Sequence, residues 1–275
     1  LSQIEILSAA KLSPLLEPQV RAHYNLHDRL HESDPAAFAK IAPHIRGIAA
    51  HGESKVPAEL IAQLPALEII SVFGVGYDGI DVQAAKERGI MVTHTPDVLT
   101  ETTADFGFAL LMATARRIAE SEHFLRRGEW TQWRYDMFAG AEVHGSTIGI
   151  IGMGRIGQGI ARRAAHGFGM RVIYHNRSRL SAESEAECKA TYVSKETLLK
   201  TADHVMLVVP YSAASHHTIG AAELALMKPT ATLVNIARGG IVDDAAVLAA
   251  LDAGQLSGYV NDFPKNVLKD HPKVV

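Results

Sequence analysis

The chain contains 275 residues, of which 47% are hydrophobic and 21% are charged, and its formal net charge is -3. This composition is typical of a soluble globular protein, and the length is sufficient for two modest domains. Without a basic surplus, the charge gives no indication of a nucleic acid or an anionic membrane as a partner.

The N-terminal segment, residues 1–13, has no basic stretch followed by an apolar one, so it does not resemble a signal peptide. The longest apolar stretch, residues 106–115, is about half of the ~20 residues that a membrane span requires. A single cysteine, Cys188, excludes an intrachain disulfide and suits a reducing compartment. We therefore expect a cytoplasmic protein.

The first third of the chain alternates between short β-branched runs and helical patterns. Strands are predicted at 4–9, 46–50, 68–73 and 90–94. Helices are predicted at 57–64, where Pro57 stands in the first turn, and at 81–89, which Gly89 ends. This alternation is typical of parallel α/β architecture, and it predicts a first domain over residues 1–97.

A long helical pattern at 100–128 follows this domain. After it, four aromatic side chains gather within nine residues: Trp130, Trp133, Tyr135 and Phe138. They can pack over the protein's own surface, or they can form a subunit interface, because surface aromatic residues favour protein contacts. The residues alone leave both interpretations open.

The remainder of the chain, residues 98–275, repeats the alternation and is predicted to form a second α/β domain. Strands are predicted at 146–152, 171–175, 204–210, 231–237 and 258–262. Continuous apolar runs of this kind are expected of strands that are buried on both faces.

Gly152, Gly154 and Gly157 have the G-x-G-x-x-G spacing between a predicted strand and a predicted helix. In that context Gly152 makes the tight turn, Gly154 lets the backbone approach a pyrophosphate, and Gly157 lets helix and strand pack closely. The helix N-terminus then stabilises the phosphate charge. The alternative is a tight turn without a ligand.

The residue that recognises the adenosine ribose lies ~20 positions beyond such a loop. Counting from Gly157 leads to Arg177, beside Asn176. A carboxylate there would accept bonds from ribose hydroxyls, whereas a guanidinium bonds and neutralises a 2′-phosphate. Ser178 adds a hydroxyl donor, and Arg179 adds a second charge. The sequence therefore predicts NADP rather than NAD, and the alternative is a solvated arginine on a loop.

Three stretches together resemble the D-isomer-specific 2-hydroxyacid dehydrogenases: SVFGVGYDGID at 71–81, the glycine loop, and NIARGGIVDDAAVLAAL at 235–251. With HNRS at 175–178, the chain is most similar to the NADPH-dependent glyoxylate and hydroxypyruvate reductases of that family. The resemblance extends from the first predicted strand to about residue 262. It implies an α/β fold of two Rossmann-like doubly wound parallel-sheet domains with a cleft between them.

The resemblance also implies how the substrate is held. GVGYD resembles the loop whose backbone N–H groups bind the substrate carboxylate, here those of Val75 and Gly76, and fixed amides suit an anion. NIARGG resembles the strand end with the substrate-binding arginine, here Arg238, whose guanidinium can hold the carboxylate and polarise the keto oxygen. Arg238 is thus the catalytic candidate. Without the resemblance, the loop would be a plain turn and Arg238 a surface residue.

Further cofactor contacts are implied by the same resemblance. Thr103 matches a position near the nicotinamide, and Asp262 matches the acid that binds the carboxamide. The remaining positions are Arg155 and Ile156 at the pyrophosphate, Val209, Pro210 and Tyr211 on the adenine side, and Ile236 and Ala237 before the arginine. Each could instead be a core, capping or turn residue. No metal ligand is predicted.

The chain departs from the family at the proton donor, which is a histidine in a Pro-His motif tuned by a glutamate. The glutamate is expected about 29 residues after Arg238, at Val267, but residues 262–275 contain none. His271 matches a loop position instead. A truncated chain, an incomplete C-terminus or natural loss of the acid would explain this. If the sequence is complete, we expect cofactor binding with little or no turnover.

The leading hypothesis is hydride transfer between NADP(H) and a small 2-keto acid, giving a D-2-hydroxy acid. Residues 1–97 would bind substrate, without the family's usual C-terminal return helix, and residues 98–275 would bind the dinucleotide. An arm at about 118–145 would join a homodimer. The alternatives are a dinucleotide-sensing binding protein with weak catalysis and a phosphoglycerate-type dehydrogenase. The sequence does not rank glyoxylate, hydroxypyruvate or other keto acids.

Overall fold

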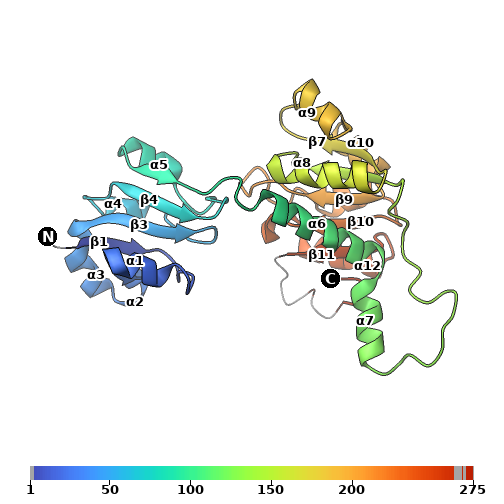
Figure 1. Ribbon diagram of the computed structural model, residues 1–275, viewed down its shortest axis with the longest axis horizontal. Coiled ribbons are helices and arrows are strands. Elements are labelled where there is room, and N and C mark those ends of the chain that lie inside the picture. The colour runs from blue at the N-terminus through green and yellow to red at the C-terminus, as the bar shows by residue number, and fades with distance from the viewer. Residues whose placement is uncertain (1–2, 263–267, 269–270, 275) are drawn as a thin grey trace. The chain divides into compact units, whose positions relative to one another are not determined.

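The computed structural model describes residues 3–262, 268 and 271–274. The chain forms two compact units, Leu1–Leu99 and Thr100–Val275, referred to below as unit 1 and unit 2 (Figure 1). Each is built around a parallel β-sheet, as the alternating pattern predicted.

The described residues of unit 1 form one parallel sheet in the order β2-β1-β3-β4-β5. Its strands are β1 (Ile4–Ser8), β2 (Tyr24–Asp28), β3 (Ile45–His51), β4 (Ile69–Phe73) and β5 (Met91–Thr93). Its helices are α1 (Glu17–His23), α2 (Leu30–Ser33), α3 (Pro35–Ile41), the 3-10 turn η1 (Ala42–His44), α4 (Ala58–Ala62) and α5 (Val82–Glu87). This is the flavodoxin-like order of a doubly wound sheet, with its reversal between β1 and β3.

The two faces of the unit 1 sheet differ in how they are covered. Along β4, Ile70 and Val72 are buried in a core with residues of α3, α4 and α5. Because side chains alternate along a strand, Ile69 and Phe73 point to the other face, where they are exposed. There they line an apolar groove of ≈ 450 Å³ together with Ile4.

The described residues of unit 2 form a parallel sheet in the order β11-β10-β9-β6-β7-β8. Its strands are β6 (Thr147–Ile151), β7 (Arg171–His175), β8 (Ala190–Tyr192), β9 (His204–Leu207), β10 (Thr232–Asn235) and β11 (Gly258–Asn261). Its helices are α6 (Thr100–Ala115), α7 (Ile118–Arg126), α8 (Arg155–Arg162), the π-helical turn η2 (Arg163–Gly167), α9 (Ala182–Glu187), α10 (Lys195–Thr201), α11 (Ala221–Leu224), the 3-10 turn η3 (Gly239–Ile241) and α12 (Asp244–Asp252). The strand order is that of the dinucleotide-binding Rossmann fold.

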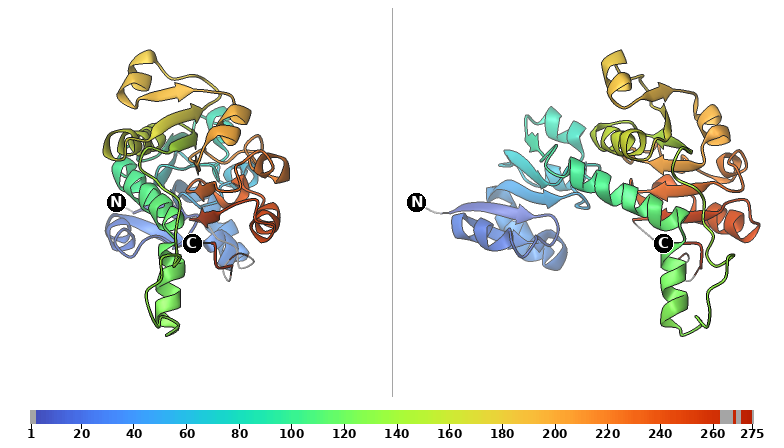
Figure 2. Two further views of the ribbon diagram at one scale, coloured as in Figure 1. Left: turned by 90° about the vertical axis from the view of Figure 1, so that its right-hand side faces the viewer. Right: turned by 45° about the vertical axis from the view of Figure 1, so that its right-hand side comes forward.

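Helices cover both faces of the unit 2 sheet, which Figure 2 shows from two further directions. Alternate residues of one strand therefore enter different cores: Tyr174 of β7 lies in the core that also contains residues of α6 and α8, whereas its neighbour Ile173 lies in the core that contains residues of α10 and α12. Burial on both faces explains why these strands have continuous apolar runs in the sequence.

The helical pattern predicted at 100–128 is confirmed over Thr100–Ala115 and Ile118–Arg126, and the structure divides it into two helices, α6 and α7. Arg117 lies between them with a left-handed φ of 53°, which ends the first helix. The Arg117 guanidinium stabilises this conformation by donating two hydrogen bonds of 2.7 Å to Glu120. It also makes a cation–π contact with the Phe138 ring, at 5.3 Å from the ring centroid. No glycine or proline marks the break, so the sequence pattern gave no signal for it.

The predicted helix ends are partly confirmed. Gly89 follows α5 with a left-handed φ of 69°, which suits its predicted role at the end of that helix. Pro57 is the N-cap of α4 rather than a residue of its first turn.

Candidate functional site

The residues predicted to hold a dinucleotide lie just beyond the carboxyl ends of the strands in the unit 2 sheet. They follow the carboxyl ends of five strands: the glycine loop after β6, 176–178 after β7, 209–211 after β9, 236–238 after β10, and Asp262 after β11. In a parallel sheet these ends share an edge, and open α/β sheets bind ligands there. Thr103 is the exception, since it lies half-buried on α6.

The glycine loop between β6 and α8 is constrained at its first glycine. Gly152 has a φ of 102°, in the left-handed region. A Cβ atom there would lie 2.5 Å from the carbonyl oxygen of Val208 and 2.8 Å from the Val209 side chain. Only glycine therefore allows β6 to turn this closely past the end of β9.

The other two glycines have different surroundings. A Cβ at Gly157 would lie 2.3 Å from the carbonyl oxygen of Gly152, so this glycine lets α8 pack onto the loop. A Cβ at Gly154 would meet no atom within 4 Å. Gly154 is also the N-cap of α8, without a side-chain hydrogen bond, so the first N–H groups of the helix have no side-chain cap. The space beside Gly154 and these N–H groups fit a pyrophosphate.

Asn176 has a contact that the sequence did not reveal. Its side-chain Oδ1 accepts a hydrogen bond of 2.7 Å from the backbone N–H of Met153, inside the glycine loop. Its backbone carbonyl accepts a bond of 3.1 Å from the Tyr192 hydroxyl on β8. Asn176 therefore holds the end of β7 against the glycine loop, and an acceptor oxygen at this position would suffice for the Met153 bond.

Arg177 and Arg179 differ in their environment. Arg177 is exposed and, like Ser178, has no hydrogen-bond or ion-pair partner among residues 3–262, 268 and 271–274. Arg179 instead makes two hydrogen bonds of 2.8 Å to Glu185, which also accepts one from the Tyr174 hydroxyl at 2.7 Å. These hydrogen bonds lower the pKa of Glu185 to about 2, and those from Arg179 have the largest effect. The charge of Arg179 is therefore already compensated, whereas that of Arg177 is available.

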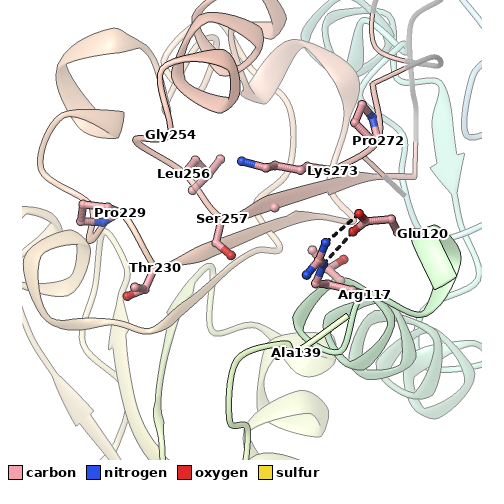
Figure 3. A pocket seen from close by; sticks show the side chains of 12 residues that line it. Arg117, Glu120, Ala139, Pro229, Thr230, Gly254, Leu256, Ser257, Pro272 and Lys273 are labelled. Carbon is pink, nitrogen blue, oxygen red and sulfur yellow. Dashed lines mark hydrogen bonds and ion pairs between the residues drawn. The ribbon is translucent and has the colours of Figure 1, made fainter. Parts of the chain in front are cut away.

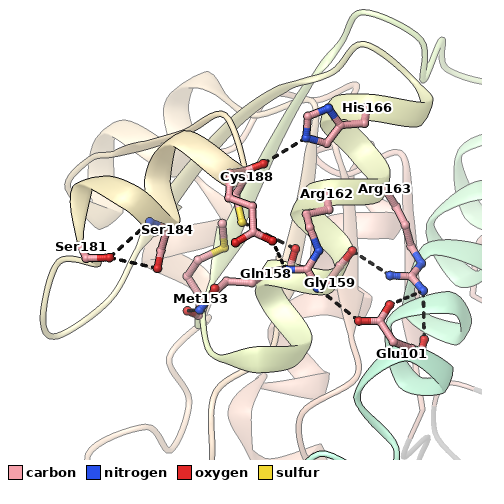
Figure 4. Close-up of polar contacts among 11 residues, drawn as sticks. Glu101, Met153, Gln158, Gly159, Arg162, Arg163, His166, Ser181, Ser184 and Cys188 are labelled. Atoms are coloured by element: carbon pink, nitrogen blue, oxygen red, sulfur yellow. Dashed lines mark hydrogen bonds and ion pairs between the residues drawn. The ribbon is translucent and has the colours of Figure 1, made fainter.

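An ion-pair network joins α6 to α8 and its π-helical extension (Figure 4). Arg163 contacts Glu101 at 2.9 Å and Asp105 at 2.5 Å, and Arg162 contacts Glu101 at 3.2 Å. A Cβ at Gly159 would lie 3.0 Å from that of Ala104, so the two helices are in close contact. The helix that contains Thr103 is thereby held against the helix that begins at the glycine loop.

Several other predicted cofactor residues belong partly to the core. Ile236 is 8% exposed and Ala237 is 6% exposed, so their side chains are buried and only their backbones can meet a ligand. Ile156 and Val209 are half-buried, whereas Arg155 and Pro210 are exposed. Tyr211 is also exposed and lies against the loop after Arg238, since a Cβ at Gly240 would be 2.7 Å from its ring.

Arg238 lies at the transition from β10 to η3, half-buried and in an extended conformation with φ -153° and ψ 153°. One guanidinium nitrogen, Nη1, donates to the carbonyl of Ala237 at 2.8 Å. Arg238 also influences Asp262: partial burial raises the pKa of this carboxyl, and the positive charge of Arg238 opposes the rise. The predicted substrate residue and the predicted carboxamide residue are thus electrostatic neighbours.

The predicted carboxylate loop in unit 1 follows β4. Gly74 begins it with a φ of 141° and is held at both backbone groups by Thr95, at 3.1 and 2.9 Å. The carbonyl of Val75 is 3.1 Å from Nδ1 of His94. The backbone N–H groups of Val75 and Gly76 donate no hydrogen bond to any described residue. Two adjacent donors on a fixed turn suit an anion such as a carboxylate.

The structure assigns no proton donor. Val267, where the family's glutamate is expected, lies outside the described residues. His271 lies in a loop 3.5 Å from Asp252, and its Nδ1 accepts a bond from the backbone N–H of Lys273. This environment is local and matches the prediction that His271 is a loop residue.

A pocket of ≈ 330 Å³ lies at the opposite, amino-terminal ends of the unit 2 strands, where β10 and β11 begin (Figure 3). Its wall includes Thr230 and Ser257, which precede these strands, and the Arg117–Glu120 ion pair. It is therefore separate from the glycine loop and Arg238.

Among the described residues, no cluster of three or more His, Cys, Asp or Glu side chains is arranged to hold a metal ion. Within the same residues, no helix combines the length and apolarity needed to cross a bilayer.

Comparison with known proteins gives consistent results. Residues 108–274 match the family model described as "D-isomer specific 2-hydroxyacid dehydrogenase, NAD binding domain". A glyoxylate reductase of Thermococcus gammatolerans is 51% identical over 208 residues, which cover 74% of this chain and 62% of the relative. A glyoxylate reductase of Thermococcus kodakarensis is 50% identical over the same share. The match thus spans 62% of the length of these relatives.

Among solved structures, an NADPH-dependent glyoxylate/hydroxypyruvate reductase from Sinorhizobium meliloti, in complex with NADP and malonate, superposes with a TM-score of 0.86. It is 33% identical, and the superposition covers 99% of this chain and 85% of that one. A 2-hydroxyacid dehydrogenase from Ketogulonicigenium vulgare is 35% identical with a TM-score of 0.84, over 100% of this chain and 87% of that one.

Proposed function

Because the chain belongs to the D-isomer-specific 2-hydroxyacid dehydrogenases, we propose that it transfers a hydride between NADP(H) and a small 2-keto acid, giving a D-2-hydroxy acid. The glyoxylate reductases that it resembles make glyoxylate and hydroxypyruvate the first substrates to test. The observation that carries the proposal is the row of predicted residues directly beyond the strand ends of the unit 2 sheet, with open space at Gly154.

The proposed preference for NADP rests on the end of β7. Asn176 occupies the position at which an acidic side chain would accept hydrogen bonds from the ribose hydroxyls of NAD. Arg177 beside it is exposed and has no hydrogen-bond or ion-pair partner among the described residues. Its planar guanidinium suits phosphate oxygens, and Ser178 adds a hydroxyl donor. The NADP in the related Sinorhizobium meliloti reductase supports the same preference.

The chain's own residues have distinct roles in this proposal. Gly152, Gly154 and the N-terminus of α8 hold the pyrophosphate, with Arg155 beside it, and Asp262 accepts a bond from the carboxamide. When bound, the nicotinamide supplies the hydride. Arg238 holds the substrate carboxylate and stabilises the negative charge that develops on the keto oxygen.

The two units divide the work in this proposal. Unit 1 is the substrate-binding domain, in which the N–H groups of Val75 and Gly76 bind carboxylate oxygens. Unit 2 is the dinucleotide-binding domain and contributes Arg238. A proton donor is not assigned to any described residue.

We also propose that the arm at 118–145 forms a homodimer. Trp130, Trp133 and Tyr135 are 53%, 66% and 91% exposed, whereas Phe138, the fourth aromatic residue of the segment, packs against Phe124 and Arg117. Large exposed aromatic side chains on one segment favour a protein contact. Cys188 is a free, buried thiol, which suits the cytoplasmic location proposed for the enzyme.

Steady-state oxidation of NADPH by the full-length gene product, with a panel of 2-keto acids, tests the proposed activity. We expect turnover with glyoxylate or hydroxypyruvate, and a loss of about 10²-fold or more in kcat/KM for Arg238→Ala, because a charge-stabilising donor is removed. NADPH binding without turnover on any keto acid would reject the activity and support a dinucleotide-sensing protein instead.

A further inference from the structure

Asn235, the last residue of β10, is fully buried. Its side chain makes hydrogen bonds to the backbone of the turn that follows β10, at Ala237 and at Arg238. Its Oδ1 accepts a hydrogen bond of 3.0 Å from the N–H of Ala237, and its Nδ2 donates one of 2.8 Å to the carbonyl of Arg238. One carboxamide therefore holds the backbone at Ala237, just before Arg238, and at the carbonyl of Arg238 itself.

A second asparagine orients this carboxamide. Asn261, the last residue of β11, pairs with Asn235 in the strand register and is 3% exposed. Its Oδ1 accepts a bond of 3.3 Å from Nδ2 of Asn235. The carbonyl of Asn235 in turn accepts the N–H of Asp262 at 3.0 Å. The amide pair thus connects the segment of Arg238 to the segment of Asp262.

The position itself does not require an amide. The same row across the sheet continues through Leu207 at the end of β9 and Ile151 at the end of β6, both of which are buried aliphatic side chains. A buried amide is costly unless its hydrogen bonds are made, so an aliphatic residue would suit a purely structural role. The two amides occur where the following residues are the proposed substrate and carboxamide contacts.

We propose that Asn235, oriented by Asn261, is a positioning residue that holds Arg238 for the 2-keto acid; this rests on the proposed function. Asn235 itself touches no substrate atom in this proposal. Without the Asn235 side chain, the carbonyl of Arg238 and the N–H of Ala237 lose their buried hydrogen-bond partner. The backbone at Arg238 is then less well fixed, and so is the position of its guanidinium. Displacements of about 1 Å at a reacting group can reduce rates roughly 10²-fold.

The test compares Asn235→Leu with Thr232→Val in the full-length gene product. Leucine has the aliphatic character of Leu207 in the same row and the same branching of heavy atoms as asparagine, so it removes the hydrogen bonds and places two larger methyl groups at the amide positions. Thr232 is the first residue of β10, at the opposite end of the strand from Asn235. It is 1% exposed and makes a hydrogen bond of 2.8 Å with Nδ1 of His204. Thr232→Val therefore removes a buried hydrogen bond of β10 without touching the Arg238 turn.

Two quantities separate positioning from stability: affinity for NADPH, by calorimetry, and affinity for oxalate on the NADPH-loaded protein, as a dicarboxylate probe of the Arg238 site. For Asn235→Leu we expect oxalate binding and kcat/KM for glyoxylate to fall at least about tenfold, and by a larger factor than NADPH affinity. For Thr232→Val we expect a lower melting temperature and no specific loss. Asn261→Leu, which leaves both bonds around Arg238 in place, should give a smaller loss in the same direction.

Unchanged oxalate affinity in Asn235→Leu, or equal losses in Asn235→Leu and Thr232→Val, would overturn the positioning role. If Asn235→Leu does not fold, Asn261→Leu decides, since an oxalate affinity equal to wild type would reject the amide pair. A wild-type protein that binds oxalate but oxidises NADPH with no keto acid would reject the proposed function alone. A wild-type protein that binds NADPH but no oxalate would reject both.

Discussion

The side-chain Oδ1 of Asn176 accepts a hydrogen bond of 2.7 Å from the backbone N–H of Met153, which connects the proposed ribose-binding residue to the glycine loop. An aspartate could accept the same bond. We therefore expect Asn176→Asp to retain the fold while its charge repels a 2′-phosphate and attracts ribose hydroxyls. Isothermal titration should show NADPH affinity reduced at least about tenfold, or 1.4 kcal/mol, with NADH affinity retained or improved.

The control for that substitution is Asn176→Ala, which removes the Met153 bond without adding charge. It should weaken NADPH and NADH by similar factors, because the loop itself is then less well held. A selective loss of NADPH in Asn176→Ala, or none in Asn176→Asp, would contradict the assignment of the ribose end.

Arg177 and Arg179 offer a matched pair of charge removals. Arg177 has no described partner, whereas Arg179 makes two bonds of 2.8 Å to Glu185. Arg177→Gln should cost about 1.5–3 kcal/mol of NADPH binding, the range for a hydrogen bond to a charged group, and little of NADH binding. Arg179→Gln should cost less for either cofactor. Equal effects of the two substitutions on NADPH would mean that Arg177 has no special role.

The glycines of the loop separate binding from stability. A Cβ at Gly154 meets open space, so Gly154→Ala should keep nearly wild-type thermal stability while its methyl group obstructs the pyrophosphate and weakens both cofactors. A Cβ at Gly157 would lie 2.3 Å from a backbone oxygen, so Gly157→Ala should lose about 1–3 kcal/mol of stability by overpacking. Thermal denaturation beside cofactor titration checks both. Wild-type cofactor affinity in Gly154→Ala would argue against a pyrophosphate at this loop.

His204 makes the stability of unit 2 depend on pH. It is fully buried between Thr232 and the carbonyl of Glu142, and burial lowers its pKa below the ordinary 6.5. The unfolded chain then binds a proton that the folded chain does not, so stability falls as the pH drops below 6.5, by at most about 1.4 kcal/mol per pH unit. Urea unfolding at pH 7.5 and 5.5 should show a smaller pH dependence for His204→Gln than for wild type.

An identical pH dependence of unfolding in wild type and His204→Gln would show that the buried imidazole is not responsible.

The sequence predicted the buried strands well because two-sided burial gives them continuous apolar runs, as in 147–151 and 171–175. It missed β2 and β8, which lie at sheet edges. β2 (YNLHD) is polar and β8 has three residues, so neither shows a clear apolar run. The break at Arg117 was also missed, because a left-handed arginine held by Glu120 and Phe138 depends on contacts that follow only from the fold.

The candidate site was predictable where chemistry is local in the chain. The glycine spacing predicted the pyrophosphate loop and the count beyond it predicted Arg177, whereas the substrate candidates and the other cofactor contacts were implied by the family resemblance. The compensation of Arg179 by Glu185 was not predictable, since it depends on how α9 packs beside β7. The signal for the amide pair was present in an asparagine that ends each of two apolar strands, Asn235 and Asn261, but their partners emerge only from the register of β10 and β11.

The relative affinity of the wild-type chain for NADPH and NADH, measured by calorimetry at one ionic strength, tests the proposed cofactor site most directly. Arg177 beside Asn176 predicts tighter binding of NADPH by at least about tenfold, or 1.4 kcal/mol. Equal affinities, or tighter binding of NADH, would contradict a 2′-phosphate site at the end of β7.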